Sequence, residues 1–275
     1  MIQVRQLGQF GNQLTQYAIA KIIAERTGHA YLPPGRWLDK RSNPLVWSGA
    51  EYFFQQPSPG IGTQSKLLNI CAAHWLDIDA LPRGFDMNLT GYFQRYELFQ
   101  PYKDRIRNDW LRIRTELPAI DPEAIYIHVR RSDYVRNDNG QPMNPHAQAI
   151  ATSIDEYAAC LKRFPPGKRL VLLTDDHTDP FLDEFRRLGS VERCRGTWDE
   201  DFLTLAAARY LILSQSTYSW WAGFLGRAER IVCPLLPGSL WHFGKNLYGP
   251  PRPRHNDYPN LCVNDEPGRW EYVTE

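Results

Sequence analysis

The chain has 275 residues, of which 43% are hydrophobic and 23% charged, and its formal net charge is +1. This length suits one large domain or two of about 130 residues, and the apolar fraction excludes global disorder. The near-zero charge excludes the field of a non-specific nucleic-acid binder. No apolar run reaches the ~18 residues of a membrane span, and the N-terminus lacks the apolar region of a secretory signal, so we expect a cytoplasmic location.

The first half of the chain carries the pattern of a β-loop-α-β unit followed by a long irregular stretch. Apolar residues recur at helical spacing between residues 12 and 27. Residues 34–65 are rich in Pro, Gly, Trp and Gln, which predicts a loop-dominated insertion. The expected strands are residues 2–7, 29–32 and 89–94, and the expected helices are residues 12–27 and 101–117.

The second half alternates short apolar segments with stretches of helical length, four times over. This alternation predicts a parallel sheet with crossover helices, and the nearly continuous apolar strands indicate burial on both faces. We therefore expect a Rossmann-like domain. Its expected strands are residues 125–129, 170–173, 191–194, 210–213 and 230–233, and its expected helices are residues 144–163, 180–188, 199–209 and 218–228.

A break between the halves is expected at residues 118–123, where the sequence Leu-Pro-Ala-Ile-Asp-Pro cannot continue a helix. The expected fold class is α/β, with two Rossmann-like domains, 1–120 and 121–275, facing across a ligand-binding cleft. We expect the tail after Pro234 to pack back over the first domain. The five cysteines are scattered, with no two at metal-ligand spacing, which predicts buried, reduced thiols and no metal site.

The segment IHVRRSDY, residues 127–134, leaves the first strand of the second half and enters a polar loop. Ligands of doubly wound folds bind outside the carboxyl ends of the strands, so Arg130 and Arg131 are placed to clamp a diphosphate by charge-assisted hydrogen bonds. The alternative is a surface pair of arginines bound to carboxylates. His128 before the pair and Asp133 after it favour the functional interpretation.

The segment LLTDDHTD, residues 172–179, is another strand end and carries two adjacent aspartates. Paired acids usually indicate a divalent metal, but guanine presents two neighbouring donors, N1–H and N2–H, that one carboxylate can accept. Asp176 is therefore our candidate for reading a guanine ring. The alternative is an N-cap for the following helix, which Asp176, Thr178 or Asp179 would provide.

The segment SQSTYSWWAGFLG, residues 214–226, joins a strand to a helix and holds four hydroxyl side chains within six residues. Hydroxyls and unpaired backbone N–H groups at a helix N-terminus form an anion site. One hydroxyl would serve as an ordinary cap, but four exceed what capping needs. The hydroxyl residues are Ser214, Ser216, Thr217 and Ser219.

The segment LGQFGNQLTQYA, residues 7–18, places Gly8 and Gly11 between a strand and a helix that Asn12 opens. Glycine lets the backbone approach a ligand closely. The segment is neither a Walker A loop nor the full dinucleotide fingerprint. By itself it is explained equally well by a tight turn with an Asn cap.

Taken in order, these four segments resemble a known set. Residues 7–18, here called the GNQ segment, resemble the GxxGNQ loop shared by the α-1,2-fucosyltransferases of glycosyltransferase family 11 and the protein O-fucosyltransferases. HVRRSDY resembles the HxRRxD element of α-1,2- and α-1,6-fucosyltransferases, and LLTDD resembles the segment that follows it. SQSTYSWWAGFLG is similar to the family 11 stretch that ends in S-x-S-W-W-x-A/G. Ser132 departs from the pattern, because family 11 normally has Gly there.

The resemblance implies a two-domain GT-B fold, a GDP-fucose donor, no required metal or cofactor, and inversion at the transferred carbon. It implies that Arg130 binds the β-phosphate and that Asp176 faces the guanine. Gly11 and Asn12 would approach the donor from the opposite domain. The full set of implied donor-site residues is Gly11, Asn12, His128, Arg131, Asp176, Ser216, Thr217 and Ser219, beside Arg130.

The expected reaction is attack by an acceptor hydroxyl on the anomeric carbon of GDP-fucose, forming an α-1,2 link to a galactoside. Arg130 and the helix N-terminus would neutralise the departing diphosphate, and Asp133 is the candidate base. The alternatives are a transferase that uses GDP-mannose or a UDP-sugar, and a non-catalytic nucleotide- or glycan-binding protein. The expected partners are a nucleotide-sugar donor and a glycan acceptor, without nucleic acid; a lipid-linked acceptor would add peripheral membrane contact.

Overall fold

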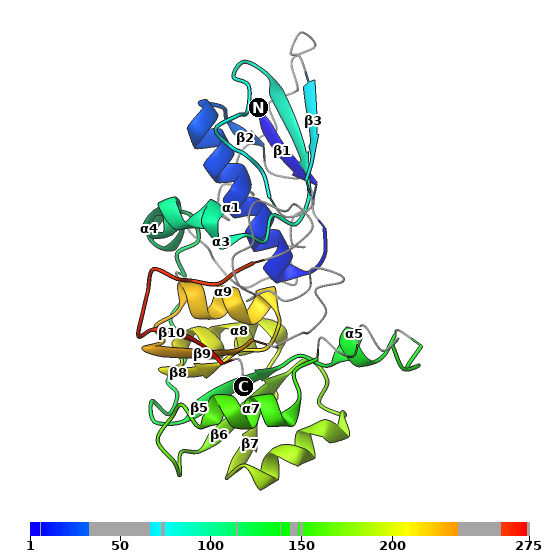
Figure 1. The fold of residues 1–275 in the computed structure, drawn as a ribbon, viewed down its shortest axis with the longest axis vertical. Helices are drawn as coiled ribbons and strands as arrows, with labels where there is room; N and C mark the ends of the chain where they lie inside the picture. The colour runs from blue at the N-terminus through cyan, green and yellow to red at the C-terminus, as the bar shows by residue number, and fades with distance from the viewer. Residues whose placement is uncertain are drawn as a thin grey trace. The chain divides into compact units, whose positions relative to one another are not determined.

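The computed structural model describes residues 1–5, 7–32, 67–72, 75–113, 115–137, 139–143, 148, 151–235 and 260–273. Two compact units contain them: the first lies within Met1–Glu116, and the second begins at Leu117 and includes the C-terminal end. Figure 1 shows the elements of both. The insertion expected at residues 34–65 lies outside the described residues, as does most of the tail.

The first unit is built on a four-stranded parallel sheet in the order β2-β1-β4-β3. Helix α1 (Phe10–Thr27) connects β1 to β2, buries an apolar side, and ends at Gly28, whose left-handed φ of 72° is typical of a helix C-terminus. The expected β-loop-α-β unit is therefore confirmed. The strands are β1 (Ile2–Arg5), β2 (Tyr31–Leu32), β3 (Leu67–Cys71) and β4 (Asp86–Thr90).

Two expectations for the first unit were wrong in their bounds. The strand expected at residues 89–94 is β4, which ends earlier because the chain turns at Phe93, a buried residue with a φ of 53°. The helix expected at residues 101–117 is a run of short helical turns that begins at Tyr96 and ends at Trp110. These turns are α3 (Tyr96–Phe99), η1 (Gln100–Tyr102), α4 (Lys103–Arg105) and η2 (Ile106–Trp110).

The second unit has a six-stranded sheet in the order β10-β9-β8-β5-β6-β7, with every neighbouring pair parallel. All five expected strands are confirmed, with bounds that differ by at most one residue. They are β5 (Ile125–Val129), β6 (Leu170–Thr174), β7 (Val191–Arg193), β8 (Tyr210–Ile212) and β9 (Arg230–Pro234). β5 and β6 are buried along their whole length and are almost entirely apolar, with His128 and Thr174 as the buried polar residues.

The sixth strand, β10 (Trp270–Val273), was not expected, because it lies in a tail rich in Pro and Gly. It pairs with β9 along its whole length. The described end of the tail therefore completes the sheet of the second unit, and the expectation that the tail packs over the first domain falls on residues outside the described ones.

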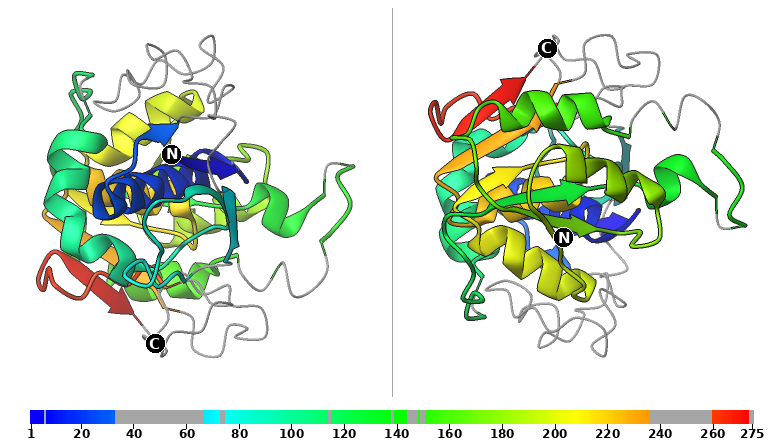
Figure 2. Two further views of the ribbon diagram at one scale, coloured as in Figure 1. Left: turned by 90° about the horizontal axis from the view of Figure 1, so that it is seen from above. Right: turned by 90° about the horizontal axis from the view of Figure 1, so that it is seen from below.

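Helices cover both faces of the second sheet, and Figure 2 shows α7 on one side and α8 on the other. The apolar core of one face joins the strands to α7 and η3 through residues such as Tyr157 and Phe185. The helices are α5 (Ser132–Val135), α7 (Ile154–Leu161), the 3-10 helix η3 (Pro180–Arg187), α8 (Trp198–Ala207) and α9 (Thr217–Leu225).

The helix expected at residues 144–163 was too long at its start. Ser153 accepts a hydrogen bond from the Glu156 N–H while the Glu156 carboxylate accepts one from the Ser153 N–H, and this capping box begins α7 at Ile154. None of the described cysteines is in a disulfide bond, but Cys71 is exposed and Cys194 only half-buried, contrary to the expectation that all five are buried. Among the described residues, no helix is long and apolar enough to cross a membrane.

Candidate active site

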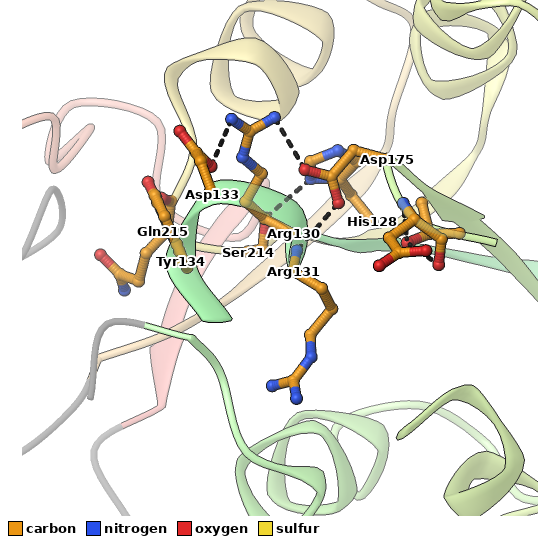
Figure 3. Close-up of polar contacts among 10 residues, drawn as sticks. His128, Arg130, Arg131, Asp133, Tyr134, Asp175, Ser214 and Gln215 are labelled. Atoms are coloured by element: carbon orange, nitrogen blue, oxygen red, sulfur yellow. Dashed lines mark hydrogen bonds and ion pairs between the residues drawn. The ribbon is translucent and has the colours of Figure 1, made fainter. Parts of the chain in front are cut away.

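The sheet order places the site. Because β5 lies between β8 and β6, the loops that follow these three parallel strands leave the same edge side by side. Arg130 follows β5 directly, Asp175 follows β6, and Ser214 and Gln215 follow β8. Figure 3 shows that these loops bring the labelled side chains together.

Arg130 is held by two carboxylates. Its Nη2 lies 2.7 Å from Asp133 Oδ1 and its Nη1 lies 2.9 Å from Asp175 Oδ2. The guanidinium also lies over the ring of Tyr134, 5.5 Å from the centroid. The alternative of an arginine bound to carboxylates is thus realised in part, but the side chains differ in exposure: Asp133 is 54% exposed, and Asp175 is 19% exposed.

Asp175 joins the ends of β5 and β6. Besides binding Arg130, its Oδ1 accepts a hydrogen bond of 2.9 Å from the Arg131 backbone N–H. Burial raises the pKa of Asp175 above its ordinary value, although the Arg130 charge and the Arg131 N–H oppose this shift. Asp175 was not among the expected site residues, and the structure gives it a positioning role for Arg130.

The Arg131 guanidinium points away from that of Arg130 (Figure 3). Its Nε lies 2.9 Å from Asp179 Oδ2, and its guanidinium carbon lies 4.1 Å from the ring centroid of Phe181. Asp179 also caps η3 by accepting from the Phe181 N–H, so the N-cap alternative is confirmed for Asp179. Arg131 therefore contacts the Arg130 cluster only through its backbone N–H, and its side chain lies elsewhere.

His128 is buried in β5, and its Nδ1 lies 2.7 Å from the hydroxyl of Ser214. Its ring packs 5.3 Å from that of Tyr218, and its carbonyl accepts a hydrogen bond from the Tyr157 hydroxyl. Burial, with a smaller contribution from the Arg130 charge, lowers the pKa of His128 to about 3. His128 is therefore neutral near pH 7 and connects β5 to the loop before α9.

This buried imidazole predicts acid sensitivity. A folded-state pKa of about 3, below the unfolded value of ~6.5, means that its contribution to stability is present above pH ~6.5 and is lost as the pH falls toward 3. His128 should reduce the free energy of unfolding by up to about 1.4 kcal/mol per pH unit in that window. Urea unfolding of the wild type and His128→Gln at pH 7, 6 and 5 tests this; parallel pH dependences would contradict it.

The loop between β8 and α9 is fixed from two sides. Its Gln215 carbonyl accepts a hydrogen bond of 2.8 Å from the Tyr134 hydroxyl, and the Gln215 amide donates to the Pro234 carbonyl. Because Tyr134 also packs against Arg130, one side chain contacts the cation and steadies the start of α9. This tyrosine belongs to the HVRRSDY segment, but sequence reasoning gave it no role.

The hydroxyls at the start of α9 are not equivalent. Ser216 is the N-cap residue, and Thr217, partly exposed, is the first residue of the helix. Ser219 is fully buried, and its hydroxyl donates to the Ser216 carbonyl at 3.3 Å. The phosphate-binding roles expected for Ser216, Thr217 and Ser219 stay predictions.

Asp176 is committed to its own loop. Its Oδ1 accepts from the Thr178 hydroxyl at 2.6 Å and from the Thr178 N–H at 2.9 Å. These bonds, the hydroxyl first, lower the pKa of Asp176. A guanine ring would therefore have to use its other carboxylate oxygen or displace the Thr178 hydroxyl.

A second carboxylate, Asp201 in α8, has an unsatisfied oxygen. Asp201 is 6% exposed, and its Oδ1 has no hydrogen-bond partner among the described residues. Burial raises its pKa, and the nearby Cys194 thiol and His177 charge offset this only in part. The lack of a side chain at Gly196 keeps the space open, because a Cβ there would lie 2.8 Å from that oxygen.

Asp201 was missed by sequence reasoning. It stands in the acidic first turn of α8, in the run WDEDF, where acids are ordinary helix-start residues. The available signal was periodicity: the following Phe202 and Leu205 are buried on the same helix, which marks Asp201 as an acid at an interior position. No group of three or more His, Cys, Asp or Glu residues within the described part of the chain is arranged to hold a metal ion.

In the first unit, α1 begins at Phe10, so Gly11 and Asn12 belong to the first helical turn rather than to a loop. Asn12 is not the cap; its Oδ1 accepts a hydrogen bond of 2.7 Å from Gln94, which follows β4. Gly8 has a φ of 71°, and a Cβ there would lie 2.2 Å from the Asn12 amide. The approach of Gly11 and Asn12 to a donor on the other domain stays a prediction.

The family model for glycosyl transferase family 11 matches residues 68–234, more than half of the sequence. The chain belongs to glycosyl transferase family 11. It is a glycosyltransferase, as its resemblance to the fucosyltransferases implied. The matched range contains three of the four sequence segments; the GNQ segment, with Gly11 and Asn12, lies outside it. No curated protein is similar enough to be counted as a relative.

Solved structures similar to this transferase include POFUT1 in complex with GDP, with a TM-score of 0.50 and 10% identity over 84% of this chain and 96% of that one. POFUT1 with GDP-fucose gives 0.49 and 12% over 84% and 96%. A variant of Arabidopsis thaliana FUT1 with GDP gives 0.46 and 13% over 84% and 70%. At these identities the likeness concerns the fold alone, and it agrees with the expected GT-B-like α/β class.

Proposed function

We propose that this family 11 transferase moves L-fucose from GDP-fucose to a hydroxyl of a galactoside, with inversion and an α-1,2 link. The observation that carries the proposal is Arg130, held at the carboxyl end of β5 beside the start of α9. The family membership and the GDP held by the similar POFUT1 structure support a guanosine diphosphate leaving group. We also propose that the enzyme acts in the cytoplasm. A lipid-linked acceptor would bring it into peripheral contact with a membrane.

The reaction forms a bond between the acceptor oxygen and the anomeric carbon while the bond from that carbon to the β-phosphate oxygen breaks. The bonding electrons leave with the diphosphate, whose charge Arg130 and the backbone N–H groups of α9 neutralise. Asp133, the more exposed carboxylate, is the Arg130 partner that the diphosphate would replace. Asp175 would stay and hold the guanidinium in place.

Asp133 is also the candidate base for the acceptor hydroxyl. Its Oδ1 is occupied by Arg130, 2.7 Å away, when no diphosphate is present. Displacement from Arg130 by the donor would release this carboxylate for proton transfer, which links donor binding to activation of the acceptor.

For the guanine, the chain offers Asp176, as expected from its sequence, and Asp201. The buried, unpartnered Oδ1 of Asp201 favours Asp201, since burying such a group costs free energy that a bound N–H donor would recover. The Nδ1 of His177 is also buried without a partner among the described residues, so a second buried polar atom is left for a ligand.

The test is a donor and acceptor screen with linkage analysis of the product. We expect transfer from GDP-fucose to β-galactosides, and stabilisation of the fold against heat by GDP but not by UDP. Transfer only from GDP-mannose or a UDP-sugar would replace the donor. Nucleotide binding without transfer or donor hydrolysis would favour the non-catalytic alternative.

A further inference from the structure

A cavity of about 550 Å³ lies beside Arg131 in the second unit, within the size range of small-molecule sites. It is distinct from the Arg130 cluster, because the two guanidinium groups point in different directions (Figure 3). Its apolar walls include Val135, Pro142 and Phe181, and its polar walls include Arg136 and Gln148.

Arg131 reaches this cavity in a fixed orientation. Its Nε is bound to Asp179, 2.9 Å away, and its flat face lies on Phe181. Asp179 is itself fixed, because it is 5% exposed and caps η3. Both Nη atoms of Arg131 have no hydrogen-bond partner among the described residues. The free outer edge of a guanidinium matches two oxygens of a carboxylate or a phosphate.

The charges around the cavity favour an anion. Its two acidic residues already have cationic partners: Asp179 is paired with Arg131, and Glu184 lies 3.2 Å from Arg187. Arg136 forms no ion pair with any residue that the structure describes, although its charge lowers the pKa of Asp176. One positive charge is therefore left without a carboxylate at the wall of the cavity.

We propose that this cavity binds a small ligand, about the size of a monosaccharide, through a carboxylate or phosphate group. The anionic group lies on the free edge of Arg131 with Arg136 beside it, and the body of the ligand packs against Phe181 and Pro142. Such a group could come from an acidic sugar or from a free phosphate. The site does not depend on the proposed donor, and it replaces the expected donor-binding role of Arg131.

The experiment is calorimetric titration of the full chain with sodium glucuronate, inorganic phosphate or glucose, the neutral counterpart of glucuronate, with the nucleotide site filled by GDP. GDP binding is measured first and separately, so its failure would count against the proposed function and not against this cavity. We expect saturable binding of glucuronate, of phosphate or of both, and none of glucose. Glucuronate binding alone would identify an acidic sugar, and phosphate binding alone a free phosphate.

Variants locate the binding. Arg131→Lys keeps the charge but loses the two-pronged edge and should weaken binding about 10-fold. Arg136→Gln, an exposed change with little risk to folding, should weaken it about threefold. Arg186→Gln is the matched control on η3, since Arg186 is 77% exposed and, among the described residues, is paired with Asp183; it should bind like the wild type.

Several outcomes would overturn the inference. These are the absence of saturable binding up to ~10 mM, equal binding of glucose, wild-type affinity in both Arg131→Lys and Arg136→Gln, or loss of binding in Arg130→Lys alone. The last result would move the anion to the Arg130 cluster.

Discussion

Replacing Arg130 by alanine should lower the rate of sugar transfer by about a thousandfold and weaken GDP binding, because the neighbouring Arg131 guanidinium points away and cannot replace it. The charge that develops on the diphosphate would lose its principal counter-charge, while the Asp175 carboxylate would lose its cation. Initial rates with GDP-fucose and calorimetry with GDP measure the two effects separately. Wild-type GDP affinity in the variant would contradict the clamp.

Asp133→Asn and Asp175→Asn separate the two carboxylates that hold Arg130. If Asp133 is the base, Asp133→Asn should lower kcat far more than it weakens GDP binding. Asp175→Asn should impair both, since Asp175 holds Arg130 and also accepts the Arg131 N–H. For Arg130→Ala, the matched control is Arg186→Ala on the surface, which removes another arginine and should leave transfer unchanged.

Replacing Asp201 by asparagine should weaken GDP binding by about 10- to 100-fold, the range for loss of hydrogen bonds to a charged acceptor. The wild type should bind GDP more tightly than inosine diphosphate, which lacks the N2 amino group, and the variant should lose this preference. Calorimetry with both nucleotides measures it. Asp176→Asn is the matched control; if that variant loses the preference and Asp201→Asn keeps it, Asp176 reads the base.

Two further readouts separate ligand recognition from structure at Asp201. Burial raises the folded-state pKa of Asp201, so the folded state holds this proton more tightly than the unfolded state does. The free energy of unfolding should therefore fall as the pH rises above the unfolded pKa of ~4. Without nucleotide, Asp201→Asn should therefore be at least as stable as the wild type at pH 7. The GDP affinity of the wild type should increase as the pH rises through the pKa of Asp201, and that of the variant should not. A strongly destabilised variant would instead indicate a structural role.

Much of the secondary structure of the second unit could be predicted, because neighbouring residues determine it. β5, β6, β8 and β9 are short, mostly apolar runs between helical segments, as expected of strands that are buried on both faces. The ends of those strands, where the polar segments begin, were therefore predicted as well. β10 was not predicted, because its four residues form a strand only by pairing with β9.

The sequence alone determined the α/β class, the family motifs and the placement of Arg130 at the end of a buried strand, because these depend on periodicity and on neighbouring residues. Only the tertiary structure decided that Arg130 and Arg131 face different surroundings, because Asp175 from the β6 loop binds Arg130 while Asp179 at the start of η3 binds Arg131. It also decided that Asp201 is buried with a free oxygen while Asp176 is satisfied by Thr178. Burial and hydrogen-bond partners are set by segments that are distant in the chain and adjacent only after folding.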